Sequence, residues 1–198
     1  MAANSKQNVS TTRGVKGGYF FSAPLETAGA PTKTDYKPTD WLTNGNPPTG
    51  WECLGYIPTD GFTESVSRDS SETIQDINLD NLDETDGSAT ETVTVALMEI
   101  KKHTMGTIYG HDNVTDANGV LEVQHNWGNS SEHYQYVFLL ELKDERYWTK
   151  YIPDGKVTEV GDLTGNKTTV AQREVTITYN TNDDGVGCFD WIDSTETT

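Results

Sequence analysis

The stretch that decides the fold covers residues 134–142 and reads YQYVFLLEL. Successive side chains of a β-strand point to opposite faces of the sheet, so a run that is apolar on both faces marks a strand covered on both sides. Here the apolar residues are Tyr134, Tyr136, Phe138 and Leu140 on one face and Val137 and Leu139 on the other. We therefore expect this segment to be a central strand.

Two more segments alternate between apolar and polar residues, which is the pattern of a strand buried on one face. They are residues 92–99 and 174–179, where Val, Leu, Ile and Tyr alternate mainly with Thr. Further strands are expected at 18–23, 61–69, 121–127, 146–152 and 189–192, with turns at Asp154-Gly155 and at 182–185. Many short strands predict a mainly β fold, an antiparallel two-sheet β-sandwich or partial barrel.

One segment has helical spacing instead. The residues at i, i+3, i+7 and i+11 are Leu97, Ile100, Thr104 and Ile108, and Lys101 and Lys102 point elsewhere. Gly110 follows as a natural cap, so we expect a single helix at about residues 100–109, flanking the sheets. Gly106 inside this helix costs about 1 kcal/mol relative to alanine, so packing must hold it in place.

The composition limits the partners of the chain. Its 198 residues carry 14 basic and 31 acidic side chains, a formal net charge of −17, which disfavours ordinary binding to DNA. Five Trp, nine Tyr and five Phe provide the apolar volume of a core and exclude wholesale disorder. The length favours a single domain over residues 1–198.

The sequence also carries expectations about compartment. No stretch approaches the roughly 20 apolar residues of a membrane helix. The N-terminus lacks the apolar run of a signal peptide, so we expect a protein that stays in the cytosol unless something larger carries it out. Cys53 and Cys188 are then expected to be reduced and buried, with a bridge between them as the less favoured alternative.

Two segments depart from the strand pattern. Residues 27–50 hold four of the seven prolines and are expected to form a long loop, of the kind that is usually functional or disordered. Residues 69–99 hold nine acidic residues and no Lys or Arg. Within them, residues 76–87 are expected to form an exposed loop or hairpin whose charges repel one another.

Motifs for catalysis and metal binding are missing. The sequence has no GxSxG or HExxH motif, and its four histidines have no recognised ligand spacing. Residues 161–168 fail the phosphate-loop pattern and fit a hairpin turn better. Residues 112–119 lack the oxygen donor that a calcium loop needs at Val114 and are better explained as a polar turn. We expect no enzyme, no cofactor and no metal.

Several short motifs occur in an order that resembles a known family. They are 18–24 (GYFFSAP), 54–57 (LGYI), 60–65 (DGFTES), 91–99 (ETVTVALME), 105–110 (MGTIYG), 151–159 (YIPDGKVTE) and 175–179 (VTITY). This order resembles the major tail tube protein of long-tailed, non-contractile bacteriophages, a family related in fold to the inner tube proteins of contractile injection systems. The resemblance covers roughly residues 15–180.

The resemblance implies a virion tail subunit, assembled in the host cytoplasm. Hexameric rings would stack into a tube, with strands of neighbouring subunits forming a continuous inner β-barrel through which viral DNA passes without specific binding. A tape measure protein in the lumen and tail terminator and tail tip proteins would be the partners, with no membrane. Residues 1–14 would be an N-terminal arm and 193–198 a flexible C-terminal tail.

The resemblance also implies roles for individual residues. The loop that reaches the adjacent ring would be 76–87, with the assembly candidates Asp76, Asp80, Asp83, Glu84, Asp86 and Gly87. The lumen-facing candidates are the polar rows of the strands bordering it: Thr63, Ser65, Ser67, Asp69, Thr92 and Thr94. Polar rows opposite apolar ones suit a wall with water on its inner side, and a negative wall would let DNA slide.

Two alternatives stay open at this point. One is a phage-associated β-sandwich binding module, such as a capsid decoration, tail tip or carbohydrate-binding domain, in which exposed Trp side chains stack on sugars. Against it, Trp51, Trp127 and Trp148 are more simply explained as core residues. The other is a hydrolase that uses two carboxylates, although 31 acidic residues provide candidate pairs in any case.

Overall fold

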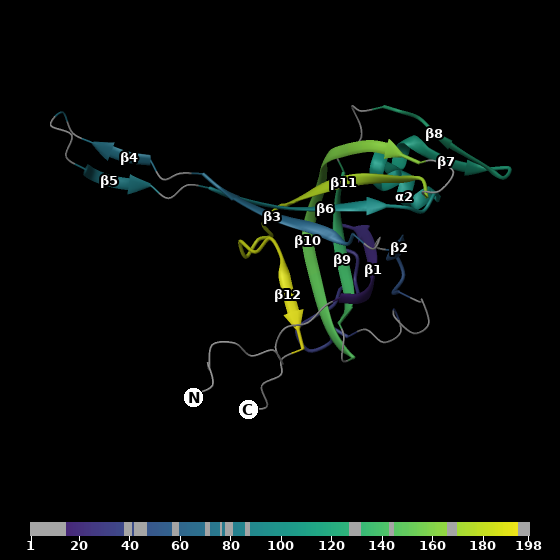
Figure 1. Cartoon of the computed structure of the whole chain (residues 1–198), viewed down its shortest axis with the longest axis horizontal. Coiled ribbons are helices and arrows are strands. Elements are labelled where there is room, and N and C mark those ends of the chain that lie inside the picture. The colour runs from purple at the N-terminus through teal and green to yellow at the C-terminus, as the bar shows by residue number, and fades with distance from the viewer. Residues whose placement is uncertain are drawn as a thin grey trace, which may run out of the picture.

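The computed structural model describes residues 15–37, 41, 47–56, 60–69, 72–75, 77, 81–85, 88–126, 132–142, 145–165 and 170–193 (Figure 1). Within them the strands are β1 (Val15–Pro24), β2 (Glu52–Tyr56), β3 (Phe62–Arg68), β4 (Glu72–Gln75), β5 (Asn81–Thr85), β6 (Ala89–Leu97), β7 (Val114–Ala117), β8 (Val120–Val123), β9 (His133–Leu142), β10 (Arg146–Thr164), β11 (Gln172–Tyr179) and β12 (Phe189–Ile192). Helix α2 (Lys102–Tyr109) and a 3₁₀ turn, η2 (His111–Asn113), complete the elements described here. In the described residues the fold is mainly β, with helix α2 flanking the sheet, as predicted.

Most strands belong to one antiparallel sheet that curves into two layers. Its order is β2-β1-β9-β10-β11-β6-β3, with β12 beside β10. The first half of β10 pairs with β9 and β12, and its second half pairs with β11. Side chains of both layers meet in one core cluster, so the arrangement is that of a sandwich. In the described residues the sheet does not close on itself into a barrel.

Strand β10 passes from one layer to the other at the place where a turn was predicted. The Asp154-Gly155 pair lies inside this 19-residue strand, so the predicted chain reversal is wrong. A Cβ on Gly155 would lie 2.7 Å from the Tyr136 ring and 2.9 Å from the Ile177 side chain. Gly155 is therefore required by close packing at the bend between the layers, not by a tight turn.

Strand β9 is covered on both faces, as the apolar run predicted. Phe138 and Leu140 belong to the main cluster between the layers. Val137 and Leu139 belong to a second cluster on the other face, with Trp51. Burial on both faces accounts for the uninterrupted run of apolar and aromatic residues at 136–140, which a strand with one solvated face does not need.

The second cluster is completed by the proline-rich loop. Trp41 is only 5% exposed and packs between Phe21 and Trp51, at ring-centroid distances of 5.1 and 5.2 Å. The described residues of segment 27–50 therefore include part of the hydrophobic cover of the sheet. Trp148 packs against the main cluster, while Trp127 lies outside the described residues.

Helix α2 confirms the predicted helix, with one error. Thr104 and Ile108 are buried as expected, but Ile100 is 70% exposed, because the chain is still extended at Lys101 and the helix starts at Lys102. Gly106 lies under the His111 ring, whose nearest carbon would be 2.5 Å from an added Cβ. This close packing is what holds a glycine inside the helix.

The region after the helix is a hairpin that the sequence analysis only partly anticipated. Strands β7 and β8 pair through Asn118 and Gly119, whose φ values of 55° and 76° are those of a tight two-residue turn. The expected strand at 121–127 therefore ends early, at Val123. The turn also accounts for the polar run at 112–119 without a calcium ion.

Three further expectations meet the structure. Cys53 and Cys188 are free, and both are half-buried. Among the described helices, none is long and apolar enough to cross a membrane. Residues 1–14 and 194–198, expected to be an arm and a tail, lie outside the described residues.

Candidate assembly surfaces

The outer face of β3, β6 and β11 carries rows of hydroxyl side chains. In the antiparallel register Thr63 faces Thr94, and Ser65 faces Thr92. Thr94 in turn faces Thr176, and their hydroxyl oxygens are 2.9 Å apart. The strands thus bring together polar residues that are up to 113 positions apart in the sequence, from Thr63 to Thr176. We call this surface the hydroxyl face.

The six residues predicted to line a lumen belong to this face or to its end. Thr63, Ser65 and Ser67 are exposed on β3, and Thr92 and Thr94 are half-buried on β6 beneath their cross-strand neighbours. Asp69 follows directly after β3 and accepts a 2.5 Å hydrogen bond from the Ser88 hydroxyl. The alternation in sequence therefore placed these side chains on one side of the sheet.

The face continues onto β10, where it also carries charges. Thr158 and Thr178 have hydroxyl oxygens 2.8 Å apart. Lys156 lies opposite Thr178, and Glu159 lies opposite Thr176 in the β10–β11 register. The row formed by Thr63, Thr94 and Thr176 is thus neutral, and the charged residues around it are Lys156 and Glu159 on β10, Glu174 on β11 and Asp69 after β3.

A second candidate surface is the β4–β5 hairpin, which projects from the body of the molecule beyond β3 and β6 (Figure 1). Asp83 and Glu84 lie on β5, opposite Ile74 and Thr73 of β4. The other predicted assembly residues, Asp76, Asp80, Asp86 and Gly87, lie outside the described residues. Ile77 between the two strands is 97% exposed.

A buried lysine fixes the strand that leads into this hairpin. Lys150 of β10 is 1% exposed, and its Nζ lies 2.8 Å from Glu64 Oε1 of β3 and 2.9 Å from Asp190 Oδ2 of β12. The Tyr179 hydroxyl also donates to Glu64 Oε1, at 2.9 Å. Burial alone would lower the pKa of Lys150, but the bonded Glu64, together with Cys188 and Asp190, raises it, so the ammonium stays charged.

The family of the chain follows from a comparison with known protein families. A family profile described as phage tail tube protein matches residues 1–198, the whole chain. The chain belongs to the phage tail tube protein family. It is a structural subunit of a phage tail tube, as its motifs suggested.

Solved structures of tail-like particles resemble this tail tube protein at low identity. The sheath-tube complex of an extracellular contractile injection system (PVC, extended state) has 11% identity over 98% of this chain and 100% of that chain, with a TM-score of 0.45. The cap of the anti-feeding prophage has 8% identity, with coverage of 96% and 99% and a TM-score of 0.44. The virion of a gene transfer agent has 10% identity, with coverage of 73% and 89% and a TM-score of 0.34. No curated protein matches the chain.

One side-chain arrangement in this tail tube protein looks like a hydrolase nucleophile but is sealed in the core. The Ser22 hydroxyl is 2.7 Å from His103 Nε2, and Glu52 Oε2 is 3.7 Å from His103 Nδ1. Ser22 is fully buried and His103 is 7% exposed, so no substrate reaches the hydroxyl. Burial, with the nearby charges of His111 and Lys101, lowers the pKa of His103 to about 3, which keeps the ring neutral.

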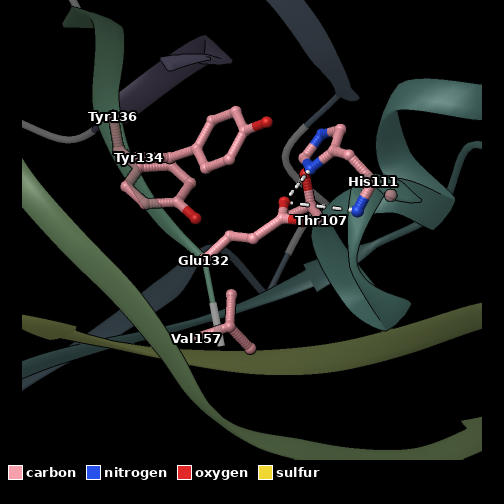
Figure 2. Close-up of a pocket in the computed structure, with 7 residues that line it drawn as sticks. Thr107, His111, Glu132, Tyr134, Tyr136 and Val157 are labelled. Carbon is pink, nitrogen blue, oxygen red and sulfur yellow. Dashed lines mark hydrogen bonds and ion pairs between the residues drawn. The ribbon is translucent and has the colours of Figure 1, made fainter. Parts of the chain in front are cut away.

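A small pocket beside this pair is equally unsuited to chemistry. Figure 2 shows Glu132 pointing at His111, whose Nδ1 lies 2.8 Å from Glu132 Oε2 while its ring stacks on Tyr134 at 4.4 Å. The free space is about 10 Å³, enough for at most one water molecule. In the part of the chain that the structure describes, no cluster of His, Cys, Asp and Glu could hold a metal ion.

Proposed function

We propose that this tail tube protein assembles into hexameric rings that stack into the conduit for DNA ejection, without enzymatic activity. The observation that supports this best is the hydroxyl face, a polar, half-solvated side on a sheet whose other side contributes Val93, Val95, Val175 and Ile177 to the core. In a ring this face would line the lumen, with Thr63, Ser65, Ser67, Asp69, Thr92 and Thr94 towards the bore. Neutral hydroxyls bind passing DNA only weakly, because phosphate binding depends on basic side chains.

The layer that carries the hydroxyl face has two lateral edges in this structure. One is the outer edge of β3, the last strand in the sheet order, and the other is the second half of β10 beyond its contact with β9. Unpaired edges favour pairing with other chains, and closing several copies into a ring satisfies them. We infer that β3 of one subunit pairs with β10 of its neighbour to complete an inner barrel.

The hairpin supplies the contact between rings in this proposal. Its strands β4 and β5 pair with each other and form a two-stranded sheet separate from the main one. An isolated two-stranded hairpin is only marginally stable in water, so its natural place is against another subunit. The tape measure protein would occupy the lumen, and terminator and tip proteins would cover the two ends of the tube.

Electron microscopy of the purified protein tests the proposal. Wild-type protein at high concentration, alone or with its tail partners, is expected to form rings and hollow tubes. A variant with residues 76–87 shortened should keep the wild-type circular dichroism and melting transition but form no stacked tubes, because the segment lies outside the core. Monomers at every concentration, with no tubes in infected cells, would overturn the proposed function.

The binding-module alternative requires exposed Trp side chains. Trp41 and Trp51 are buried, while Trp148 and Trp191 are half-buried. A glycan array in which no sugar binds above background is the expected result.

A further inference from the structure

An apolar cavity opens at the end of the sandwich where helix α2 meets the sheet. Its volume is about 240 Å³, and its apolar lining includes Leu97, Met98, Ile100, Met105, Ile108 and Leu163. Three large hydrophobic residues at or next to this cavity are exposed to solvent, Ile100 at 70%, Leu163 at 65% and Val170 at 57%. Exposed apolar surface concentrated around a cavity is typical of a binding site.

The edge of this cavity carries basic side chains in a strongly acidic protein. Arg173 lines it, and its guanidinium donates to two neutral oxygens, the Gly161 carbonyl and the Tyr109 hydroxyl. Glu99 also lines the cavity but is neutralised by Lys101, at 2.6 Å. Lys102 is exposed on the α2 face that carries Met105, since i and i+3 positions are neighbours on a helix. The surroundings therefore favour an apolar ligand with negative flanks.

The same chain presents a group of that chemistry on its hairpin. Ile77 is 97% exposed, the highest exposure among the large hydrophobic residues described. The sequence around it reads Asp76-Ile77-Asn78-Leu79-Asp80, so acidic residues flank the isoleucine on both sides. Moving an isoleucine side chain from water into an apolar site is favourable, so the exposed Ile77 would be more stable against an apolar surface than in water.

The isoleucine and the cavity lie at opposite ends of one strand. Strand β6 leaves the hairpin at Ala89 and reaches the cavity at Leu97, nine residues or about 30 Å away. Figure 1 shows the hairpin and α2 at the two ends of the molecule's long axis. A subunit with a projection at one end and a matching hollow at the other makes head-to-tail contacts, which repeat without limit unless they close on themselves.

We propose that Ile77 of one copy inserts into the α2 cavity of a second copy, at the side where Lys102 and Arg173 lie. The occupant is thus the hairpin of another subunit of the same protein. The inference rests on the proposed function and deepens it, since it names the receiving surface of the contact between rings. It also assigns a role to an apolar cavity that the lumen and the sheet edges do not use.

Engineered cysteines test the contact in the full-length protein. The Ile77→Cys/Ile100→Cys variant, oxidised during assembly, should give a ladder of disulfide-linked oligomers on a non-reducing gel. The matched control is Val120→Cys/Ile100→Cys, because Val120 is also an exposed hydrophobic residue, on β8 and outside the proposed contacts. Both positions are exposed, so neither change disturbs the core. The single-cysteine variants report any links made by Cys53 or Cys188.

A second measurement uses charge in place of the cross-link. Ile77→Asp should raise the protein concentration needed for stacking by about tenfold to a hundredfold, the equivalent of one isoleucine side chain left unburied. Ile100→Asp should do the same from the other side of the contact. Val120→Asp, at an exposed residue of β8, is the control and should stack like the wild type.

The outcomes separate this inference from the proposed function. Tubes that form normally from Ile77→Asp overturn the inference and leave the tube function intact. So does a ladder that Val120→Cys/Ile100→Cys gives and Ile77→Cys/Ile100→Cys does not. Single rings that no longer stack support both. If the wild type forms neither rings nor tubes and the Ile77→Cys/Ile100→Cys variant stays unlinked, the proposed function and the inference both fail.

Discussion

The buried His103 gives the sharpest prediction about stability. In the unfolded chain this histidine has a pKa near 6.5, whereas burial in the folded protein, next to His111 and Lys101, lowers its pKa to about 3. Because the folded pKa is the lower one, the neutral ring stabilises the fold above about pH 6.5, and this stability is lost as the pH falls towards 3.

The size of the effect follows from the two pKa values. At about pH 4.5 the unfolded chain has bound a proton at His103 and the folded chain has not. The free energy of unfolding is therefore about 3 kcal/mol lower than at about pH 7.5. A loss of this size is a large fraction of the stability of an ordinary domain. The other charged group on the ring is Glu52, 3.7 Å from Nδ1, and it is exposed enough for water to screen its field.

The assay is urea unfolding at several pH values between about 4 and 8, on the wild type and on His103→Gln. Glutamine keeps a hydrogen-bonding partner for Ser22 but does not titrate, so the difference between the two proteins isolates His103 from all other acid-titrating groups. On going from about pH 7.5 to about 4.5, the free energy of unfolding should fall by about 3 kcal/mol more in the wild type than in the variant. Two parallel stability curves would refute the reasoning.

Three further predictions concern the core and the thiols. Lys150→Ala should lower the free energy of unfolding by about 2 kcal/mol, since it leaves Glu64 and Asp190 without their shared cation. The control, Lys156→Ala on the outer face of the same strand, should change the free energy of unfolding little. Equal effects of the two substitutions in urea unfolding would contradict the buried network. Gly155→Ala should lower the free energy of unfolding by about 1–3 kcal/mol, because a Cβ there meets the Tyr136 ring at 2.7 Å. Gly17→Ala, with open space around the added Cβ, should lower it far less. A melting temperature unchanged by Gly155→Ala would show that the bend can relax. Burial raises the pKa of the Cys188 thiol to about 12. At about pH 8 its alkylation, measured by mass spectrometry, should therefore be about a thousandfold slower in the native protein than in urea. Equal rates would mean that the thiol is not buried.

Sequence patterns predicted the strands whose burial is regular. Strand β9 was recognisable because both of its faces are apolar, and β11 because one of them is. Alternation also sufficed to put Thr63 and Thr94 on one face, since residues two apart in a strand share a side. What these patterns left open is which strands are neighbours, because pairing depends on contacts between distant segments.

Other features were missed for two different reasons. Asn118-Gly119 is a strong hairpin signal by itself, so β7 could have been predicted from its turn. The course of β10 could not, because the same Asp154-Gly155 pair is compatible with a turn and with a packed bend, and only the Tyr136 ring decides between them. The Lys150–Glu64 pair, 86 positions apart, left no local signal, since a lysine in a strand normally indicates an exposed position.

Because β10 serves both layers, the described part of this subunit has no break between the layers at which one could swing against the other. Any movement of one layer against the other would break hydrogen bonds in the middle of a single strand, on the side of β9 or on the side of β11. A filament built from such rigid blocks has to take up curvature at the joints between them. If the proposed contact between the β4–β5 hairpin and the next subunit forms, that contact would set the flexibility of the whole tail, while each subunit keeps its shape.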